Sequence, residues 1–421
     1  MREMKDSGIS YVGKIPSNWD MHPVYYYFGE RKHRNRMGQE DNLLSLSYGN
    51  IVRKDINTSE GLLPESFNTY NIVEAGDIII RPTDLQNDKR SLRTGLVKER
   101  GIITSAYLDL MPIKKINSAF FRYLLHAFDV TKVFYNMGNG VRQGLNFSEF
   151  SRLMVFEPPI EEQNAIARFL DSKCNEFDSV SADIQTQINV LEQYKRSVIT
   201  ETVTKGLNSE VTLKDSGIQW IGQIPAHWDM HPLYVYFGER KHKNSLGYED
   251  NLLSLSYGNI IQKDINTSDG LLPESFNTYN IIEPGDIVIR PTDLQNDKRS
   301  LRTGLAKEHG IITSAYIALK PIKSVNTAYY HYLLHAFDVM KVFYNMGNGV
   351  RQGLNFSEFS RLVVFEPPLD EQNAIVDYLD AKCSEIDKVI ADKKEQLETI
   401  EEYKKSLIYE YVTGKKEVPV A

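Results

Sequence analysis

Apolar and small residues recur with a strict alternation of four and three positions in two long segments of the chain. The first series follows Pro158-Pro159 and the second follows Pro367-Pro368. This spacing is typical of coiled coils and predicts two helices of about 40 residues, each about 60 Å long at 1.5 Å per residue. The positions are Leu170, Cys174, Phe177, Ser181, Ile184, Ile188, Leu191, Lys195 and Val198, and then Leu379, Cys383, Ile386, Ile390, Lys393, Leu397, Ile400, Lys404 and Leu407.

Each of these helices alone would expose a long apolar seam to water. We therefore predict that the two helices pack on each other as an antiparallel coiled coil, with one globular domain at each end. The alternative is that each helix packs only on its own domain. Cys174 and Cys383 each lie near the start of their helix. An antiparallel arrangement places these two starts at opposite ends of the pair, so no disulfide is expected between the cysteines.

The segments before the Pro-Pro pairs show a mixed pattern. Short β-like runs at 77–81 and 153–156 alternate with turn signals such as Gly49-Asn50 and Glu60-Gly61, and a helical stretch covers 120–135. This pattern predicts globular domains of the α/β (α+β) class.

The chain matches itself without a gap at a shift of 209 positions, as from Asp6 to Asp215. Roughly three-quarters of the aligned positions are identical, so one unit is written twice. The expected organisation is a tandem repeat with globular domain 1 at 1–159, spacer helix 1 at 160–205, globular domain 2 at 206–368, spacer helix 2 at 369–416 and a tail at 417–421. A two-fold ligand suits such a chain.

Differences between the two copies are unevenly distributed. From Tyr135 to Pro159, aligned with Tyr344 to Pro368, the only change is Met154 to Val363, whereas the following helical segments differ at more than half of their positions. We interpret the invariant segment as a reading surface and the drifting segment as a scaffold.

Composition is that of an ordinary globular chain of 421 residues, with 41% hydrophobic and 25% charged residues. No run approaches 18 apolar residues and the start lacks a signal-peptide core, which predicts a cytoplasmic protein without membrane contact. Two cysteines at equivalent repeat positions make neither a disulfide framework nor a zinc site, and His22 and His231 resemble single surface histidines. We therefore expect no metal site.

The net charge of -7 does not exclude nucleic acid, because a DNA-binding surface needs only a local basic field. One basic cluster recurs in full in the second copy, which favours a role beyond solvated surface charge. Its members are candidates for phosphate contacts, which set register without reading sequence: Arg81, Lys89, Arg90 and Arg93, and then Arg290, Lys298, Arg299 and Arg302.

Two further segments carry candidate base-reading residues. A glycine-flanked loop presents Arg and Gln, which can bind guanine and adenine through two hydrogen bonds each, and a second segment presents Tyr and Asn. The simpler interpretation is a turn with solvated polar residues. The loop candidates are Asn139, Arg142, Gln143 and Asn146, with Asn348, Arg351, Gln352 and Asn355; the second set is Tyr48 and Asn50, with Tyr257 and Asn259.

Catalytic motifs are missing from the sequence. There is no GxxxxGK[ST] phosphate loop, and the Pro-Pro pairs do not form the Asn/Asp-Pro-Pro-Tyr/Phe motif of a methyltransferase. Asp20, Glu30 and Lys32 could suggest a nuclease, but they lie in a basic patch that binds phosphate or solvent more simply. We therefore expect no catalytic residue.

The order of these motifs resembles a known family. The segments GNGVRQGLNFSEFSRLMVFEPPIEEQNAIARFLD and GNGVRQGLNFSEFSRLVVFEPPLDEQNAIVDYLD, together with the openings DSGISYVGKIPSNWD and DSGIQWIGQIPAHWD, are similar to the specificity (S) subunit of type I restriction-modification enzymes. The resemblance covers nearly the whole chain.

This resemblance implies two target-recognition domains that read a bipartite site in double-stranded DNA, with the helices fixing the gap. It also implies two methyltransferase subunits, which hold S-adenosylmethionine and methylate adenine, and leaves open restriction or translocase subunits as further partners. The S subunit would have no cofactor of its own. Near-identical domains would read an inverted repeat. The alternative is a coiled-coil scaffold protein without DNA specificity.

Overall fold

The computed structural model describes residues 2–9, 12–57, 64, 66–83, 85, 92–133, 135, 137, 144–218, 221–266, 273, 275–292, 294, 301–346 and 353–419. The chain folds into two compact units. Unit 1 comprises Met1–Ile184 and Lys394–Ala421, and unit 2 comprises Gln185–Lys393. Each unit therefore contains one globular domain and a part of both long helices.

The long helices are α3 (Ile160–Lys205) and α6 (Leu369–Val412). Each helix begins directly after a Pro-Pro pair and has two acidic residues in its first turn. Negative charges at this position stabilise the helix, because they interact favourably with the positive end of the helix dipole. The residue after α3 is Gly206, whose φ of 75° belongs to the left-handed conformation that commonly ends helices. All eighteen positions of the predicted seam are buried or partly buried, which confirms the predicted heptad pattern.

Contacts within each unit show that these helices run antiparallel. In unit 1, the ring centroids of Phe169 and Tyr411 lie 4.6 Å apart and those of Phe177 and Tyr403 lie 5.5 Å apart. Residue numbers therefore increase along α3 in the direction in which they decrease along α6. In unit 2, Lys195 Nζ lies 2.6 Å from an Asp387 oxygen, and Lys393 Nζ donates to Gln187. The predicted antiparallel coiled coil is confirmed.

Unit 1 contains twelve strands and two short helices within its described residues. α1 (Ser118–Val130) and α2 (Phe147–Phe150) are α-helices, and short 3-10 turns occupy Val24–Tyr26 and Phe67–Thr69. The strands are β1 (Met4–Asp6), β2 (Lys14–Pro16), β3 (Asp20–Pro23), β4 (Phe28–Glu30), β5 (Leu44–Ser47), β6 (Asn50–Arg53), β7 (Asn71–Val73), β8 (Ile78–Ile80), β9 (Thr94–Leu96), β10 (Gly101–Ile103), β11 (Leu108–Pro112) and β12 (Met154–Glu157).

Unit 2 repeats this order. Its short α-helices are α4 (Thr327–Val339) and α5 (Phe356–Phe359), and its 3-10 turns occupy Leu233–Val235 and Val342–Asn345. The strands are β13 (Leu213–Asp215), β14 (Gln223–Pro225), β15 (Asp229–Pro232), β16 (Phe237–Glu239), β17 (Leu253–Ser256), β18 (Asn259–Gln262), β19 (Asn280–Ile282), β20 (Ile287–Ile289), β21 (Thr303–Leu305), β22 (Gly310–Ile312), β23 (Ile317–Pro321) and β24 (Val363–Glu366).

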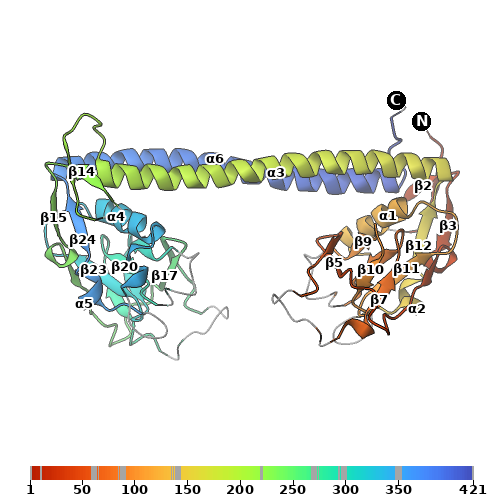
Figure 1. Ribbon diagram of the computed structural model, residues 1–421, viewed down its shortest axis with the longest axis horizontal. Coiled ribbons are helices and arrows are strands. Elements are labelled where there is room, and N and C mark those ends of the chain that lie inside the picture. The colour runs from red at the N-terminus through yellow and green to blue at the C-terminus, as the bar shows by residue number, and fades with distance from the viewer. Residues whose placement is uncertain are drawn as a thin grey trace. The chain divides into compact units, whose positions relative to one another are not determined.

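An antiparallel sheet of four strands forms the centre of each domain, in the order β4-β11-β8-β9 in unit 1 and β16-β23-β20-β21 in unit 2. Four two-stranded pairs surround it, including β3 with β12 and the hairpin of β5 with β6. In each unit, the helix α1 or α4 lies between this sheet and the long helices (Figure 1). This arrangement confirms the predicted α+β tandem repeat.

The hydrophobic core of each unit is shared between the domain and both long helices. In unit 1, the fully buried Trp19 and Phe120 belong to the same cluster as Leu170 of α3 and Leu407 and Tyr411 of α6. The alternative in which each helix packs only on its own domain is therefore wrong. Burial of this shared apolar surface holds each domain on the helical pair.

Both cysteines are buried and free, Cys174 in unit 1 and Cys383 in unit 2. Among the described residues, no helix has the length and apolar character required to cross a membrane.

Candidate nucleic-acid interface

Most of the predicted reading loop lies outside the described residues. This applies to Asn139, Arg142, Gln143, Asn348, Arg351 and Gln352, and also to the phosphate candidates Lys89, Arg90, Lys298 and Arg299. The segments that support these loops are described, and they show how the sequence places the loop ends.

Arg93 corrects one expectation, because its side chain is fully buried rather than available to a phosphate. Its Nε donates to the Tyr135 hydroxyl at 2.9 Å, and its guanidinium donates to the carbonyl of Thr83. Tyr135 in turn donates to Asp129, a buried carboxyl whose pKa burial raises. Arg302 is also fully buried and repeats the network with Thr292, Tyr344 and Asp338. This arginine is an internal anchor.

The anchor joins two segments that are far apart in the sequence. The Leu145 backbone N–H donates to the Pro82 carbonyl at 3.0 Å, and Leu354 repeats the bond to Pro291. The described ends of the basic loop and of the reading loop therefore meet at one place in each unit. The sequence did not predict this convergence, because each segment on its own resembles an ordinary surface loop.

Asn146 has a structural role in the described part of the reading loop. It caps α2: its side-chain oxygen accepts from the Glu149 backbone N–H at 3.0 Å, and the Glu149 carboxylate accepts from the Asn146 backbone. Asn355 forms the same capping box at α5. The capping bonds occupy the oxygen that a base contact would use, and they fix where the loop ends.

The second candidate segment is a tight hairpin between β5 and β6. Ser47 pairs with Asn50, so Tyr48 and Gly49 alone form the turn, with φ of 46° and 79°. Positive φ at both central residues defines a type I′ turn, whose twist suits a two-residue hairpin. Tyr257 and Gly258 repeat the turn, with φ of 45° and 83°.

Tyrosine is an unfavourable choice for this turn, because a side chain in the left-handed conformation costs about 1–2 kcal/mol. The Tyr48 side chain is nevertheless 84% exposed, and Tyr257 is 81% exposed. Asn50 and Asn259 lie beside the turns, and each amide donates to the preceding tyrosine carbonyl at 3.5 Å. A strained, exposed aromatic ring that appears in both units is suited to stacking on or inserting against a ligand.

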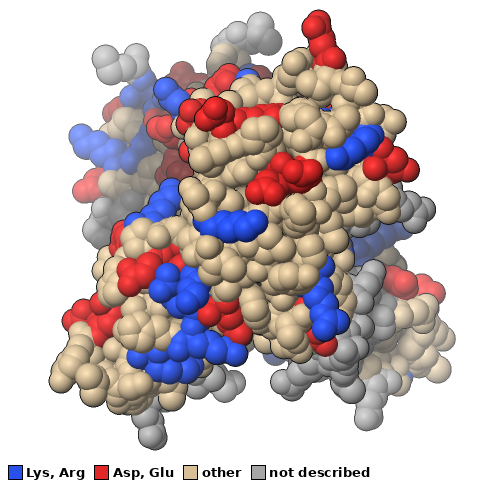
Figure 2. All heavy atoms as spheres, turned by 90° about the vertical axis from the view of Figure 1, so that its left-hand side faces the viewer, with Lys and Arg blue, Asp and Glu red and all other residues tan. Residues whose placement is uncertain are grey.

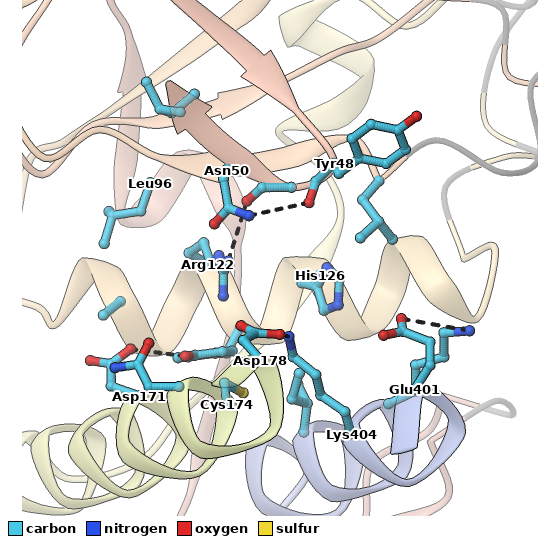
Figure 3. Close-up of a pocket in the computed structure, with 18 of the residues that line it drawn as sticks. Tyr48, Asn50, Leu96, Arg122, His126, Asp171, Cys174, Asp178, Glu401 and Lys404 are labelled. Atoms are coloured by element: carbon cyan, nitrogen blue, oxygen red, sulfur yellow. Dashed lines mark hydrogen bonds and ion pairs between the residues drawn. The ribbon is translucent and has the colours of Figure 1, made fainter. Parts of the chain in front are cut away.

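A cavity of about 490 Å³ lies behind the unit 1 hairpin, between the turn, α1 and the two long helices (Figure 3). Arg122 and His126 extend from α1 into this space. Arg122 donates to the Gly49 carbonyl at 3.2 Å and so ties the hairpin to α1. Their spacing of four residues on one helix face is visible in the sequence, but no motif distinguishes them from other polar residues of a helix.

The other charges that line this cavity are largely paired. Lys404 donates to Asp178 at 2.5 Å, and Tyr123 donates to Asp171 at 2.8 Å. His126 is 8% exposed, and its Nδ1 has no hydrogen-bond partner among the described residues. Burial and the charges of Arg122 and of nearby lysines lower its pKa to about 3, so the ring is neutral at physiological pH.

The remaining basic groups are divided between structural and exposed positions. Arg31 donates from Nε to the fully buried Asp77 at 2.7 Å, so it is structural. Lys32, Arg34 and Arg36 instead line a surface hollow of about 460 Å³. Arg81 and Arg290 are partly buried, at positions where their backbones bond to Arg93 and Arg302. Figure 2 shows basic and acidic side chains interspersed among the described residues of the face that it presents.

Comparisons with known proteins agree with this architecture. No family model matches the chain. The putative type I restriction enzyme MjaX specificity subunit of Methanocaldococcus jannaschii is 23% identical over 429 residues, which cover 96% of this chain and 95% of that protein. The type I restriction enzyme MjaVIII specificity subunit of the same organism is 25% identical over 331 residues, 75% of each chain.

One solved chain shares the fold with a TM-score of 0.68, at 13% identity and over 96% of this chain and 99% of that one. It comes from a structure that addresses complex assembly and conformational transition of the type I R-M system. The repeated α+β domains and the paired long helices thus define a fold found in type I restriction-modification systems. In sequence, the chain is similar along nearly its whole length to a protein named as a type I restriction enzyme specificity subunit, and over three-quarters of its length to a second protein of that name.

Proposed function

We propose that this chain is the non-catalytic subunit that gives a type I restriction-modification complex its DNA sequence specificity. Each globular domain is a target-recognition domain that reads one half of a bipartite site in double-stranded DNA. The observation that carries the proposal is the repeated loop support, in which Arg93 and Arg302 anchor loop segments that are almost identical in the two copies. Near-identical readers predict half-sites that form an inverted repeat.

The catalytic groups belong to the partners in this proposal. Two methyltransferase subunits hold S-adenosylmethionine and methylate adenine, and restriction or translocase subunits can join the same complex in the cytoplasm. This chain needs no cofactor for that role. The paired helices α3 and α6 set the gap between the half-sites. The coiled-coil scaffold without DNA specificity is not supported by the relatives, which are named as specificity subunits.

Single-molecule methylome sequencing tests the proposal. Cells that express this chain with its neighbouring methyltransferase should show methyladenine in a two-part inverted motif, and cells without this chain should lack it. Active methyltransferase that yields no motif with the chain present would support the scaffold instead. An asymmetric motif would retain the specificity function but reject equal reading by the two copies.

Arg142→Ala and Arg351→Ala, made separately, test the reading loop. Each variant removes a side chain suited to guanine and should relax one half of the motif, at a cost of about 1–3 kcal/mol in discrimination. Lys14→Ala, which removes a charge from an exposed position of β2, is the matched control. Size-exclusion chromatography should show unchanged assembly. Unchanged motifs in both arginine variants would show that these side chains do not read the site.

Removing one heptad from both helices tests the role of α3 and α6 as a spacer. Seven residues at 1.5 Å each shorten a helix by about 10 Å, close to three base pairs at about 3.4 Å each. The preferred gap in the methylated motif should shorten accordingly. A fixed gap in an assembled complex would contradict the spacer role.

A further inference from the structure

Strand pairing in unit 2 gathers three side chains that can bind a metal ion. Asp229 and His231 are alternate residues of β15, so they lie on one face of the strand. Glu366 of β24 is the pairing partner of Asp229 and lies on the same face. One ligand atom from each residue lies within 4.8 Å of the other two, and His231 Nε2 is 3.8 Å from Glu366 Oε2.

The two carboxylates of this group are directly opposite each other, an arrangement that like charges disfavour. Among the described residues, Asp229 has no cationic partner, and Glu366 has only the imidazole of His231. The Tyr236 hydroxyl donates to Glu366 Oε2 at 2.6 Å and fixes the orientation of this carboxylate. Hydrogen bonds of this kind commonly orient the carboxylate ligands of metal sites. A divalent cation would offset the repulsion.

Unit 1 provides an internal control, because it contains the same residue types at Asp20, His22 and Glu157. There the Tyr27 hydroxyl also donates to Glu157, at 2.7 Å. The His22 ring, however, stacks on Tyr26 with centroids 4.0 Å apart and an angle of 22° between the rings. Only the unit 2 group has all three ligand atoms close together among the described residues.

One neighbouring position bears directly on the histidine ring. Tyr26 of unit 1 aligns with Val235 of unit 2, which has no aromatic ring on which His231 could stack. His231 is therefore available to Glu366. The sequence alone predicted no metal site because each histidine stood apart from other ligands, and strand pairing supplies the two carboxylates.

We propose that Asp229, His231 and Glu366 form a Zn²⁺ site on β15 and β24 of unit 2. One imidazole and two carboxylates suit Zn²⁺ better than Mg²⁺, which prefers oxygen ligands alone. Zinc bonds of about 2.0–2.2 Å place tetrahedral ligands about 3.3 Å apart, so small side-chain rotations close the present geometry. Water completes the coordination. The site lies outside the loops and hairpin assigned to DNA and is independent of the proposed function.

Isothermal titration calorimetry with ZnCl₂ tests this proposal on the full, untagged chain after treatment with a chelator. We expect one Zn²⁺ to bind per chain and MgCl₂ not to compete. His231→Ala should weaken this binding at least tenfold, and Val235→Tyr should do the same by providing the ring found in unit 1. His22→Ala is the matched control and should bind as the unsubstituted chain does.

Tyr26→Val gives the converse measurement, because a second bound Zn²⁺ would show that stacking on Tyr26 is what excludes the ion from unit 1. Circular dichroism of each variant establishes that it is folded; the His231 side chain is 46% exposed, so its replacement should be tolerated. The proposal is overturned if the unsubstituted chain binds no Zn²⁺. It is also overturned if folded His231→Ala binds Zn²⁺ as tightly as His22→Ala.

Discussion

The two units share one fold but differ in the ionisable groups that lie along the same strand and helix. In unit 1, β11 carries Asp109 and α1 carries Arg122, whereas unit 2 has Ala318 and His331 at the aligned positions. A buried strand position and a half-buried helix position have therefore diverged in charge, while the loop supports around Arg93 and Arg302 have kept every bond of their networks. This contrast shows that exchange is tolerated at these two positions and that the bonds at the base of the loops are kept.

The buried acid gives unit 1 a pH dependence of its own. Asp109 is 1% exposed, and burial together with the charge of Asp77 raises its pKa to about 8. Between about pH 4 and 8 the folded state keeps a proton that the unfolded state has lost, so unit 1 loses stability as pH rises. Arg31 Nε lies 3.9 Å from Asp109 Oδ2, and its positive charge only partly offsets the rise in the pKa of Asp109.

Histidines give unit 2 the opposite tendency. Burial lowers the pKa of His331 to about 4 and that of His335 to about 3. Below about pH 6.5 the unfolded state gains protons that the folded state does not bind, so unit 2 loses stability as pH falls. Unit 1 has one such histidine on the aligned helix, His126.

The largest effect should come from the loop anchors. Arg93→Met leaves the Tyr135 hydroxyl and the Thr83 carbonyl without their guanidinium partner, and it should destabilise unit 1 by about 1–3 kcal/mol for each of these groups. Arg302→Met should do the same to unit 2. Hydrogen exchange read by mass spectrometry can separate the units, because peptides from α1 and α4 differ in sequence. Equal loosening of both units by either variant would contradict independent anchoring.

A smaller effect is expected from the buried acid. Asp109→Ala copies unit 2 and should stabilise unit 1 by about 1–3 kcal/mol at pH 8, since it removes a carboxyl group whose raised pKa costs stability above about pH 4. The gain should vanish near pH 4. Urea unfolding followed across this pH range measures it, and Ala318→Asp is the reverse substitution. A gain that did not depend on pH would reject the raised pKa as its cause.

Exchanging the helix residues should have a still smaller effect. His331→Arg removes one of the two depressed histidine pKa values in unit 2 and should recover about 1 kcal/mol of its stability at pH 5. Arg122→His should transfer the acid sensitivity to unit 1. Hydrogen exchange at pH 5 and pH 7 compares the two variants. If α4 peptides exchange alike with and without the substitution at pH 5, His331 does not control this response.

The smallest effect concerns a matched ion pair on the long helices. Asp178 pairs with Lys404 in unit 1, and Asp387 pairs with Lys195 in unit 2. Because both aspartates are exposed, Lys404→Ala and Lys195→Ala should each lower the free energy of unfolding by less than about 1 kcal/mol. Thermal unfolding should show the same loss for the two variants. A clear difference between the two variants would show that the helical seam is not equivalent in the two units.

The sequence predicted the long helices well because a heptad pattern is a local signal that Leu170, Ile184 and their neighbours carry on their own. The strands at 77–81 and 153–156 were also recognisable, as β8 and β12. The burial of Arg93 could not be predicted. An arginine in a loop has the same local sequence pattern whether or not the fold places buried groups such as Tyr135 and Asp129 beside it. The unit 2 metal ligands were missed for the same reason, since Glu366 reaches His231 only through strand pairing.

The repeated ion pair has a consequence for how such a gene can change. Asp178 and Lys195 occupy the repeat positions of Asp387 and Lys404, so α3 presents to α6 the same residues that α6 presents to α3. Recombination between the two near-identical gene halves would delete one copy and leave a half-length product. Its single long helix would then carry both members of the pair, and a second molecule of the same product would supply the complementary surface as a symmetric dimer.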